Sequence, residues 1–361
     1  MPQKKRRSSS AKLPDDPQAT GEADEFTGGR NPSFSGVPTF LQMPLIEDAA
    51  ALKAKKVDLA IVGAPLDWAT TYRAGARFGP RAIRQANYIT SAGIHHLGLG
   101  IMPLQVLRLA DAGDAFCPPG DIAAGHEAIK AKVGEVLGAG CIPLVLGGDH
   151  SITLPSATAV ADRHGHKKVG IIHFDAHADT GEDSWGVLLS HGTPMRRLIE
   201  SGAYAGKNFV QIGLRGYWPP PNIVAWMKKQ GMRWHLMREI EERGFDAVMD
   251  DAIAEALDGP EFVYLSVDID VLDPAHAPGT GTPEPGGLTS VELLRAVRRI
   301  AQELKLVGMD VVEVAPAYDS AEITAAVANR VVLEAISGLA ARRLKGANSS
   351  SSKTSRPVKS G

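Results

Sequence analysis

Short apolar runs alternate with longer amphipathic stretches through most of the chain. Three of the runs, 142–146, 169–174 and 262–267, are rich in β-favouring residues, which is typical of buried parallel strands. Further strands are predicted at 57–65, 209–214 and 307–314. Helices are predicted at 79–86, 122–138, 154–164, 223–230, 245–257, 291–304 and 321–344. The alternation of strand and helix predicts an α/β fold, a single three-layer domain with a mostly parallel, doubly wound sheet.

The two ends of the chain differ in composition from the region between them. Residues 1–35 are polar and interrupted by Gly and Pro, which predicts a flexible N-terminal tail. Residues 346–361 are rich in Ser and Lys and predict a disordered C-terminal tail. With 361 residues, 44% of them apolar, the chain can form one large domain, which we place at 36–345.

Charge and cysteine content argue against several classes of function. The formal net charge of −2 favours no polyanionic partner, so we expect no nucleic-acid binding. We find no apolar run of about 18 residues, so no membrane span is expected. The basic cluster Lys4–Arg7 is not followed by an apolar segment, which favours a solvated tail over a secretory, nuclear or transit signal. Two cysteines are too few for a disulfide framework and indicate a reducing, cytoplasmic location.

Most of the candidate chemistry lies in three short segments, Gly147–Ser151, Asp175–Asp179 and Ser266–Pro274. Each follows a predicted strand, and in open α/β sheets the ligand crevice lies beyond the carboxyl ends of the strands. The segments should therefore bring Asp and His side chains together at one edge of the sheet. Carboxylates packed that closely repel one another unless cations lie between them. Because Asp and His without Cys suit Mn, Ni, Fe or Zn, we interpret the cluster as a two-metal hydrolytic centre.

These segments resemble the signature motifs of the ureohydrolases, the arginase and agmatinase family, and Ala277–Leu288 is most similar to the agmatinase-like branch. The resemblance covers Pro38 to Leu344 and includes Arg77–Arg84. It implies an arginase/deacetylase-like fold, a ureohydrolase catalytic domain at 36–345 and six metal ligands. By resemblance these ligands are His150, Asp175, His177, Asp179, Asp268 and Asp270.

The residue pattern supports this ligand set independently. In an extended segment alternate residues share a face, so Asp175, His177 and Asp179 can point the same way. The same holds for Asp268 and Asp270. Each donor follows an apolar run, where an unpaired charge would be expensive. Any one of them alone fits a helix cap or a hydrogen-bonded core residue better, but six together do not. We interpret Asp149 as a helix cap or a partner of a metal ligand, and Asp273 as a turn residue.

The resemblance also implies the reaction and its cofactors. Two divalent ions, Mn²⁺ by resemblance with Ni²⁺ left open, would share a bridging hydroxide that attacks the carbon of a guanidino group, giving urea and an amine. His191 matches the family histidine that passes protons to the leaving amine, and Glu313 matches the carboxylate that pairs with the guanidinium. The alternatives are a loop histidine bonded to backbone and a glutamate in an ordinary surface pair.

The loop Thr180–Leu189 departs from the arginase pattern. The Asn- and Ser-rich residues that would hold the α-carboxylate and α-amine of an amino acid are not recognisable there, so arginine is a poor candidate. Glu182 and Asp183 are candidates to pair with a distal amine such as that of agmatine. The alternative is that both are solvated loop charges.

Aromatic and basic residues near this loop leave the substrate class open. Trp185 and the aromatic–proline segment 217–221 are candidate walls for a small or alkylated guanidinium, although such loops more often serve packing. Arg215 either meets the carboxylate of a guanidino acid or braces the loop. The expected substrate is therefore agmatine, a guanidino acid, or a small or alkylated guanidine.

Other functions are compatible with parts of this pattern. A formimino-group hydrolase of the same fold would use the same metals and release formamide. A subunit or regulator of a heteromeric ureohydrolase would be expected to lose a metal position or His191, and this chain retains them all. A structural metal-binding protein would need neither His191 nor Glu313. By resemblance we expect a homo-oligomer, a trimer or a hexamer.

Overall fold

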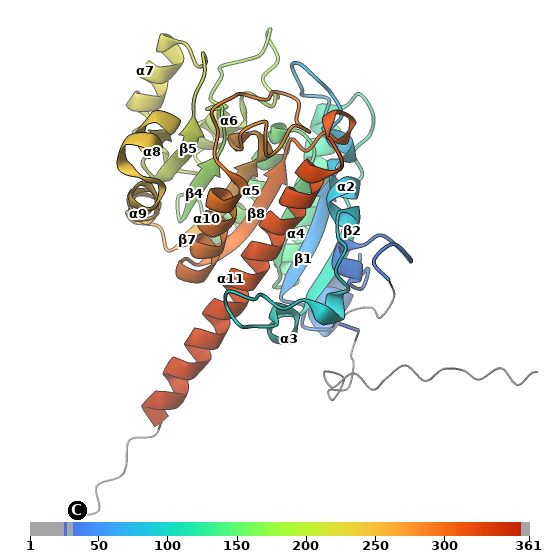
Figure 1. The fold of residues 1–361 in the computed structure, drawn as a ribbon. Coiled ribbons are helices and arrows are strands. Elements are labelled where there is room, and N and C mark those ends of the chain that lie inside the picture. Colours follow the sequence, from blue (N-terminus) through green and yellow to red (C-terminus); the bar gives the residue numbers. More distant parts are fainter. Residues whose placement is uncertain (1–24, 27–31, 355–361) are drawn as a thin grey trace, which may run out of the picture.

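The computed structural model describes residues 25–26 and 32–354, which form an eight-stranded sheet between two layers of helices (Figure 1). The order of the strands across the sheet is β2-β1-β3-β8-β7-β4-β5-β6, and every neighbouring pair is parallel. The strands are β1 (Leu59–Ala64), β2 (Leu109–Asp114), β3 (Ile142–Gly147), β4 (Val169–Phe174), β5 (Phe209–Leu214), β6 (Arg233–Leu236), β7 (Phe262–Asp268) and β8 (Leu306–Val312). The predicted α/β fold is confirmed.

Helices cover both faces of the sheet (Figure 1). One face packs against α1 (Ala49–Ala54), α4 (Ile122–Gly138), α5 (Thr153–His164), α6 (Pro194–Glu200) and α7 (Pro221–Lys229). The other face packs against α2 (Gly79–Gln85), α3 (Pro103–Val106), α8 (Met237–Arg243), α9 (Phe245–Ala256), α10 (Ser290–Glu303) and α11 (Ile323–Thr354).

Each face of the sheet has its own apolar core, because successive residues of a strand point to opposite faces. In β1, Leu59 and Ile61 pack in one core, whereas Ala60, Val62 and Ala64 pack in the other. Strands buried on both sides therefore need apolar residues at every position, which is why they appear in the sequence as continuous apolar runs.

The six predicted strands are confirmed to within two residues at either end. The elements absent from the prediction are short or polar. The edge strand β6 has the sequence Arg-Trp-His-Leu, and β2 ends in Asp-Ala-Gly-Asp, so neither forms an apolar run. The helices α1, α3, α6 and α8 have seven residues or fewer, too short for a clear helical period.

The boundaries of the two predicted tails need correction. The helix α11 continues beyond its predicted end at Leu344 to Thr354, within the segment that we predicted to be disordered. Extending an existing helix needs no new nucleus, and Ser costs only a fraction of a kcal/mol per residue relative to Ala. At the other end, Phe26 is buried although it belongs to the predicted N-terminal tail. The rest of that tail before residue 32, including Lys4–Arg7, and residues 355–361 lie outside the described residues.

The long helix α11 is a core element. By length and composition its residues 323–347 could cross a membrane, and this is the one helix in the described part of the chain that passes that test. The most apolar window of this helix is 78% buried inside the protein, which is the pattern of a core helix.

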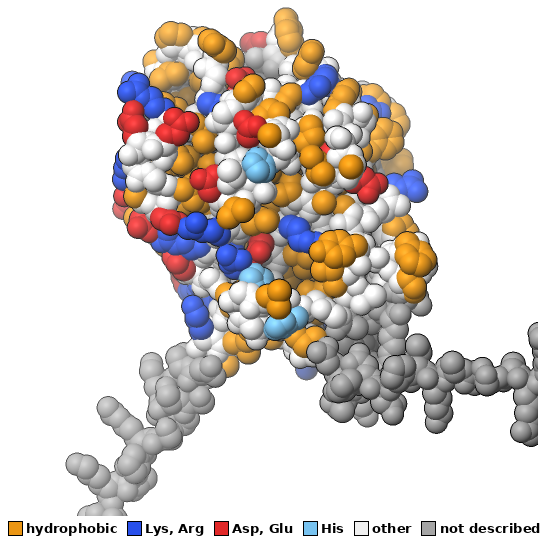
Figure 2. All heavy atoms as spheres, viewed as in Figure 1, with side chains coloured by type: hydrophobic (Ala, Val, Ile, Leu, Met, Phe, Trp, Pro, Cys, Tyr) orange, Lys and Arg blue, Asp and Glu red, His pale blue; other side chains and the backbone are white. Residues whose placement is uncertain are grey.

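Charges of both signs are intermixed on the face shown in Figure 2. Two ion pairs join α9 and α10, Arg295 with Asp246 at 2.5 Å and Arg299 with Asp250 at 2.5 Å.

Four adjacent strands in the middle of the sheet, β3, β8, β7 and β4, end at the same edge. His150 follows β3, Glu313 follows β8, Asp268 ends β7 and Asp175 follows β4. The parallel arrangement thus brings together residues that are far apart in the sequence.

Candidate metal centre

The first group of donors is centred on His150. Its Nδ1 atom lies 3.0 Å from a carboxylate oxygen of each of three residues, Asp175, Asp179 and Asp268. The side chain is buried, and within the described residues Nδ1 has no hydrogen-bond partner. Buried polar atoms almost always have a hydrogen-bond partner or bind a ligand, so the unpartnered nitrogen indicates that a further group binds here. Three carboxylates and one imidazole form a suitable donor set for a divalent metal ion.

The second group of donors is centred on His177. Its Nδ1 atom lies 3.1 Å from Asp270 Oδ2 and 3.4 Å from Asp175 Oδ1. Asp175 faces His150 with Oδ2 and His177 with Oδ1, so it belongs to both groups. The six predicted ligands therefore lie together in two groups that share one carboxylate, as two neighbouring cations would require.

The electrostatics of the site also call for cations. Burial raises the pKa of Asp268 well above its usual range, and the negative charges of Asp270 and Asp175 raise it further. Burial likewise raises the pKa of Asp270. Divalent cations between these carboxylates would remove the repulsion and keep them ionised. The residues present thus fit a pair of divalent cations.

A chain of hydrogen bonds behind His150 fixes its ring. Ser266 Oγ lies 2.9 Å from His150 Nε2 and donates its own proton to Asp310 Oδ1 at 2.7 Å. Asp310 is fully buried and also accepts O–H bonds from Thr153 at 2.8 Å and Tyr264 at 2.6 Å. Because the Ser266 hydroxyl donates to Asp310, its oxygen accepts a hydrogen bond from the Nε2–H of His150. The lone pair of His150 is therefore on Nδ1, which faces the carboxylates.

His173 was not among the predicted site residues. Its Nε2 atom lies 2.8 Å from Asp175 Oδ2, and its Nδ1 atom accepts a bond from Gln211 Nε2 at 2.9 Å. His173 therefore donates to the carboxylate that both groups share, and so orients it. The signal that could have found it is an imidazole inside the apolar strand β4, where an unpaired polar group would be costly.

Two residues of the site have an unusual backbone conformation. Asp179 has φ 50° and Glu313 has φ 63°, in the left-handed region that residues other than Gly rarely adopt. Such a conformation costs about 1–3 kcal/mol and persists where the surroundings enforce it. Here backbone bonds hold both residues, from Met195 N to Asp179 O at 3.1 Å and from Glu313 N to Gly148 O at 2.9 Å.

His191 and Glu313 form a hydrogen-bonded pair beside the first donor group. His191 Nδ1 lies 2.9 Å from Glu313 Oε1, and the Thr71 N–H donates to His191 Nε2 at 3.1 Å, so the proton of the neutral ring is on Nδ1. Burial lowers the pKa of His191, but the charge of Glu313 outweighs this and raises it to about 9. Glu313 is 1% exposed, which excludes an ordinary surface pair, and its Oε2 atom has no hydrogen-bond partner in the described part of the chain.

Asp149 and Asp273 have the structural roles that the sequence indicated. Asp149 accepts the backbone N–H of Ser151 at 3.0 Å and caps the helical turn His150–Ile152. Asp273 accepts the backbone N–H of Ala275 at 2.9 Å and closes a turn.

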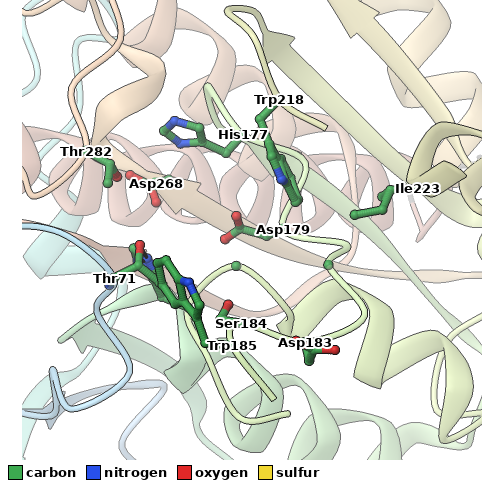
Figure 3. A pocket seen from close by; sticks show the side chains of 13 residues that line it. Thr71, His177, Asp179, Asp183, Ser184, Trp185, Trp218, Ile223, Asp268 and Thr282 are labelled. Atoms are coloured by element: carbon green, nitrogen blue, oxygen red, sulfur yellow. Dashed lines mark hydrogen bonds between the residues drawn. The ribbon is translucent and has the colours of Figure 1, made fainter. Parts of the chain in front are cut away.

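A cavity of about 450 Å³ opens onto the two donor groups (Figure 3). His177, Asp179, Asp268 and His191 lie on its inner wall. In Figure 3, Trp185 and Trp218 lie on opposite sides of Asp179. The other lining residues are Gly181, Asp183, Ser184, Thr71, Gly192, Ile223 and Thr282.

The structure separates the predicted substrate residues into two sets. Asp183 and Trp185 line the cavity, whereas Glu182 does not and lies 3.9 Å from Arg196 at the surface. Arg215 does not line the cavity either. Its guanidinium donates to backbone carbonyls, among them those of Asp270 at 2.7 Å and Glu284 at 2.6 Å, so it braces the surrounding loops. The predictions of substrate contact by Glu182 and Arg215 are therefore not supported.

Comparisons with known proteins agree with this geometry. A family model described as "Arginase family" matches residues 57–338, a range that contains all six predicted metal ligands, His191 and Glu313. A guanidinopropionase from Pseudomonas aeruginosa is 41% identical over 310 residues, which cover 86% of this chain and 93% of that protein. A guanidinobutyrase from the same organism is 40% identical over 293 residues, which cover 81% and 89%. The X-ray structure of a hypothetical agmatinase from Burkholderia thailandensis has a TM-score of 0.78 at 34% identity, covering 89% of this chain and 96% of that one.

Proposed function

This chain belongs to the arginase family, and we propose that it hydrolyses the guanidino C–N bond of a small guanidino compound to give urea and an amine. The observation that carries the proposal is the His150 Nδ1 atom, which is buried without a hydrogen-bond partner in the described part of the chain and faces three carboxylates at 3.0 Å. The names of the relatives and the adjoining cavity support the substrate class.

Two divalent cations bound by the six donors would supply Lewis-acid charge and lower the pKa of a bound water toward about 7. We propose Mn²⁺, and Ni²⁺ as the alternative, since imidazole and carboxylate donors suit both. The ligands would be His150 with Asp179 and Asp268 on one side and His177 with Asp270 on the other, with Asp175 shared.

The other polar residues of the site act on the substrate. Glu313 has one carboxylate oxygen without a partner in the described residues, and we propose that it accepts an N–H bond from the guanidinium. Because its pKa is raised to about 9, His191 would hold a second proton at Nε2, on the side of Thr71, and would pass it to the departing amine nitrogen. Its Nδ1–H bond to Glu313 would keep the ring oriented during this transfer.

The test is urea release by the purified full chain loaded with Mn²⁺ or Ni²⁺, compared with its Asp268→Asn variant. Because Asp268 lies 3.0 Å from His150 Nδ1, we expect the variant to lose at least about 100-fold in turnover and to bind less metal, measured by elemental analysis. Near-normal turnover would rule out the ligand role. Formamide in place of urea would support a formimino-group hydrolase, and a metal-loaded but inert chain would support the subunit of a heteromer.

A further inference from the structure

We propose that the outer part of the cavity selects guanidino compounds whose distal group is a cation, such as the amine of agmatine, and discriminates against a carboxylate. This inference rests on the proposed function and names its substrate class.

The cavity has room for more than a guanidinium. A guanidinium has four heavy atoms and occupies roughly the volume of three to four waters, at about 30 Å³ each. The cavity measures about 450 Å³, so most of it is left for the rest of the substrate. The walls farther from the metal donors therefore decide which distal group is accepted.

The walls away from the metal donors carry a carboxylate but, within the part of the chain that the structure describes, no lysine or arginine. Asp183 lines the cavity, and among the described lining residues there is no Lys or Arg. The guanidinium groups of two arginines in neighbouring segments are bonded to backbone carbonyls and do not line the cavity. Arg73 donates to the carbonyls of Thr280 at 2.9 Å and Gly281 at 3.2 Å, and Arg215 donates to several other backbone carbonyls. The distal carboxylate of a guanidino acid would meet Asp183 without a lysine or arginine of the described lining to pair with it.

Two indole rings complete a site suited to a cation. Trp185 is 86% exposed yet lines the cavity, and Trp218 lies on the opposite side of Asp179 (Figure 3). The faces of aromatic rings attract ammonium and guanidinium groups, Trp most strongly. A tight turn holds the loop in this shape, because Gly186 N donates to Asp183 Oδ1 at 2.8 Å and Ser184 exchanges backbone bonds with Val187. The turn thus fixes the loop from which both Asp183 and Trp185 contribute to the cavity wall.

This preference differs from the one in the names of the two relatives, guanidinopropionase and guanidinobutyrase, whose substrates carry a carboxylate. We therefore expect that an identity of about 40% does not carry the substrate over to this chain.

The experiment uses three guanidines of similar length that differ in the charge of the tail. Agmatine has a cationic tail, N-butylguanidine an uncharged one and 4-guanidinobutyrate an anionic one. Urea release by the metal-loaded full chain gives kcat/KM for each. We expect agmatine to exceed 4-guanidinobutyrate by about 10-fold or more, because one tail is attracted to Asp183 and the indoles and the other is repelled. N-butylguanidine should fall between them.

Two neighbouring acidic residues provide a matched pair of variants. Asp183→Asn keeps an oxygen for the Gly186 N–H and removes the charge, and it should lower kcat/KM for agmatine about two- to five-fold, clearly more than for N-butylguanidine. Glu182→Gln removes a charge from the adjacent position, which lies outside the cavity lining, and should leave all three substrates unchanged.

The outcomes separate this inference from the proposed function. If 4-guanidinobutyrate is hydrolysed as fast as agmatine, or if Asp183→Asn affects agmatine and N-butylguanidine equally, the cation selection is wrong and guanidino hydrolysis stands. If none of the three releases urea with either metal, both fail.

Discussion

The proposed metal donors, three of which line the cavity, and the loop Thr180–Leu189 beside them have very different surroundings. His150 and Asp175 are buried at strand ends, and each has a polar partner behind it, Ser266 for the histidine and His173 for the carboxylate. Asp183 and Trp185 lie on an exposed loop whose shape depends on a few turn hydrogen bonds. The first region is built so that a displaced side chain is costly, whereas the second tolerates substitution.

This difference indicates how such a fold divides its tasks. The residues at the carboxyl ends of four neighbouring strands would determine which bond of the substrate is cleaved. Their side chains meet only when the whole sheet is formed. The loop would fix which molecule is accepted, and it can change without disturbing the sheet. Substitutions in the two regions should therefore differ in the size and in the kind of their effects.

The largest effect is expected at His191, which lies between the two regions. The change His191→Asn removes a group that we propose to carry protons, and it should lower kcat by about 10²–10⁴-fold. Bound metal should not change, since His191 is not among the donors facing His150 or His177. Urea release and elemental analysis of the same sample measure both quantities. Loss of metal together with turnover would place His191 in the rigid donor region.

The sequence predicts the rigid region far better than the loop, for physical reasons. His150 and Asp268 could be placed because each follows an apolar run, and parallel strands end at one edge. His173 was not predicted as a site residue because it lies inside an apolar run and not after one. The exposed loop has no helical or strand periodicity from which the orientation of its side chains could be inferred. The sequence therefore could not show that Asp183 lines the cavity and that its neighbour Glu182 does not.

Acid should weaken the rigid region through His126. This residue of α4 is buried, with Nε2 3.0 Å from Ser151 Oγ, and burial lowers its pKa from 6.5 to about 4. Between these values the unfolded chain binds a proton that the folded chain does not, so the free energy of unfolding falls as the pH drops through this window. The free energy of unfolding falls by at most about 3 kcal/mol, because each unit of the pKa difference between the unfolded and folded chain corresponds to about 1.36 kcal/mol.

The measurement is urea-induced unfolding at pH 7 and pH 4.5, in the presence of a chelator so that release of metal does not contribute. Other groups also titrate over this range, so the comparison is with His126→Gln, which keeps a polar side chain and lacks the titration. The variant should lose less stability on acidification. Equal losses in the two proteins would show that His126 is not the group responsible.

The hydrogen bonds behind the donors can be tested with a matched pair of hydroxyls. Ser266 and Tyr264 both donate to Asp310, but Ser266 also contacts His150 Nε2. Ser266→Ala should weaken binding of one of two metal ions about 10- to 100-fold, measured by competition with a chelator, and Tyr264→Phe should have a smaller effect. Equal effects would mean that the bond to His150 does not fix the ring.

The smallest effect is expected at the tip of the loop. Trp185 is 86% exposed and has φ 51°, a conformation that Gly adopts without strain. In Trp185→Gly the relief of strain and the extra freedom of Gly in the unfolded chain oppose each other, so the free energy of unfolding should change by less than about 1 kcal/mol. KM for agmatine should rise about two- to five-fold, because an exposed cation–π contact is lost, and kcat should stay the same.

Leu188→Gly is the control, since Leu188 belongs to the same loop but does not line the cavity, and it should leave KM unchanged. A fall in the kcat of Trp185→Gly, or a marked loss of its stability, would show that the loop is coupled to the metal donors, and the contrast between the two regions would then not hold.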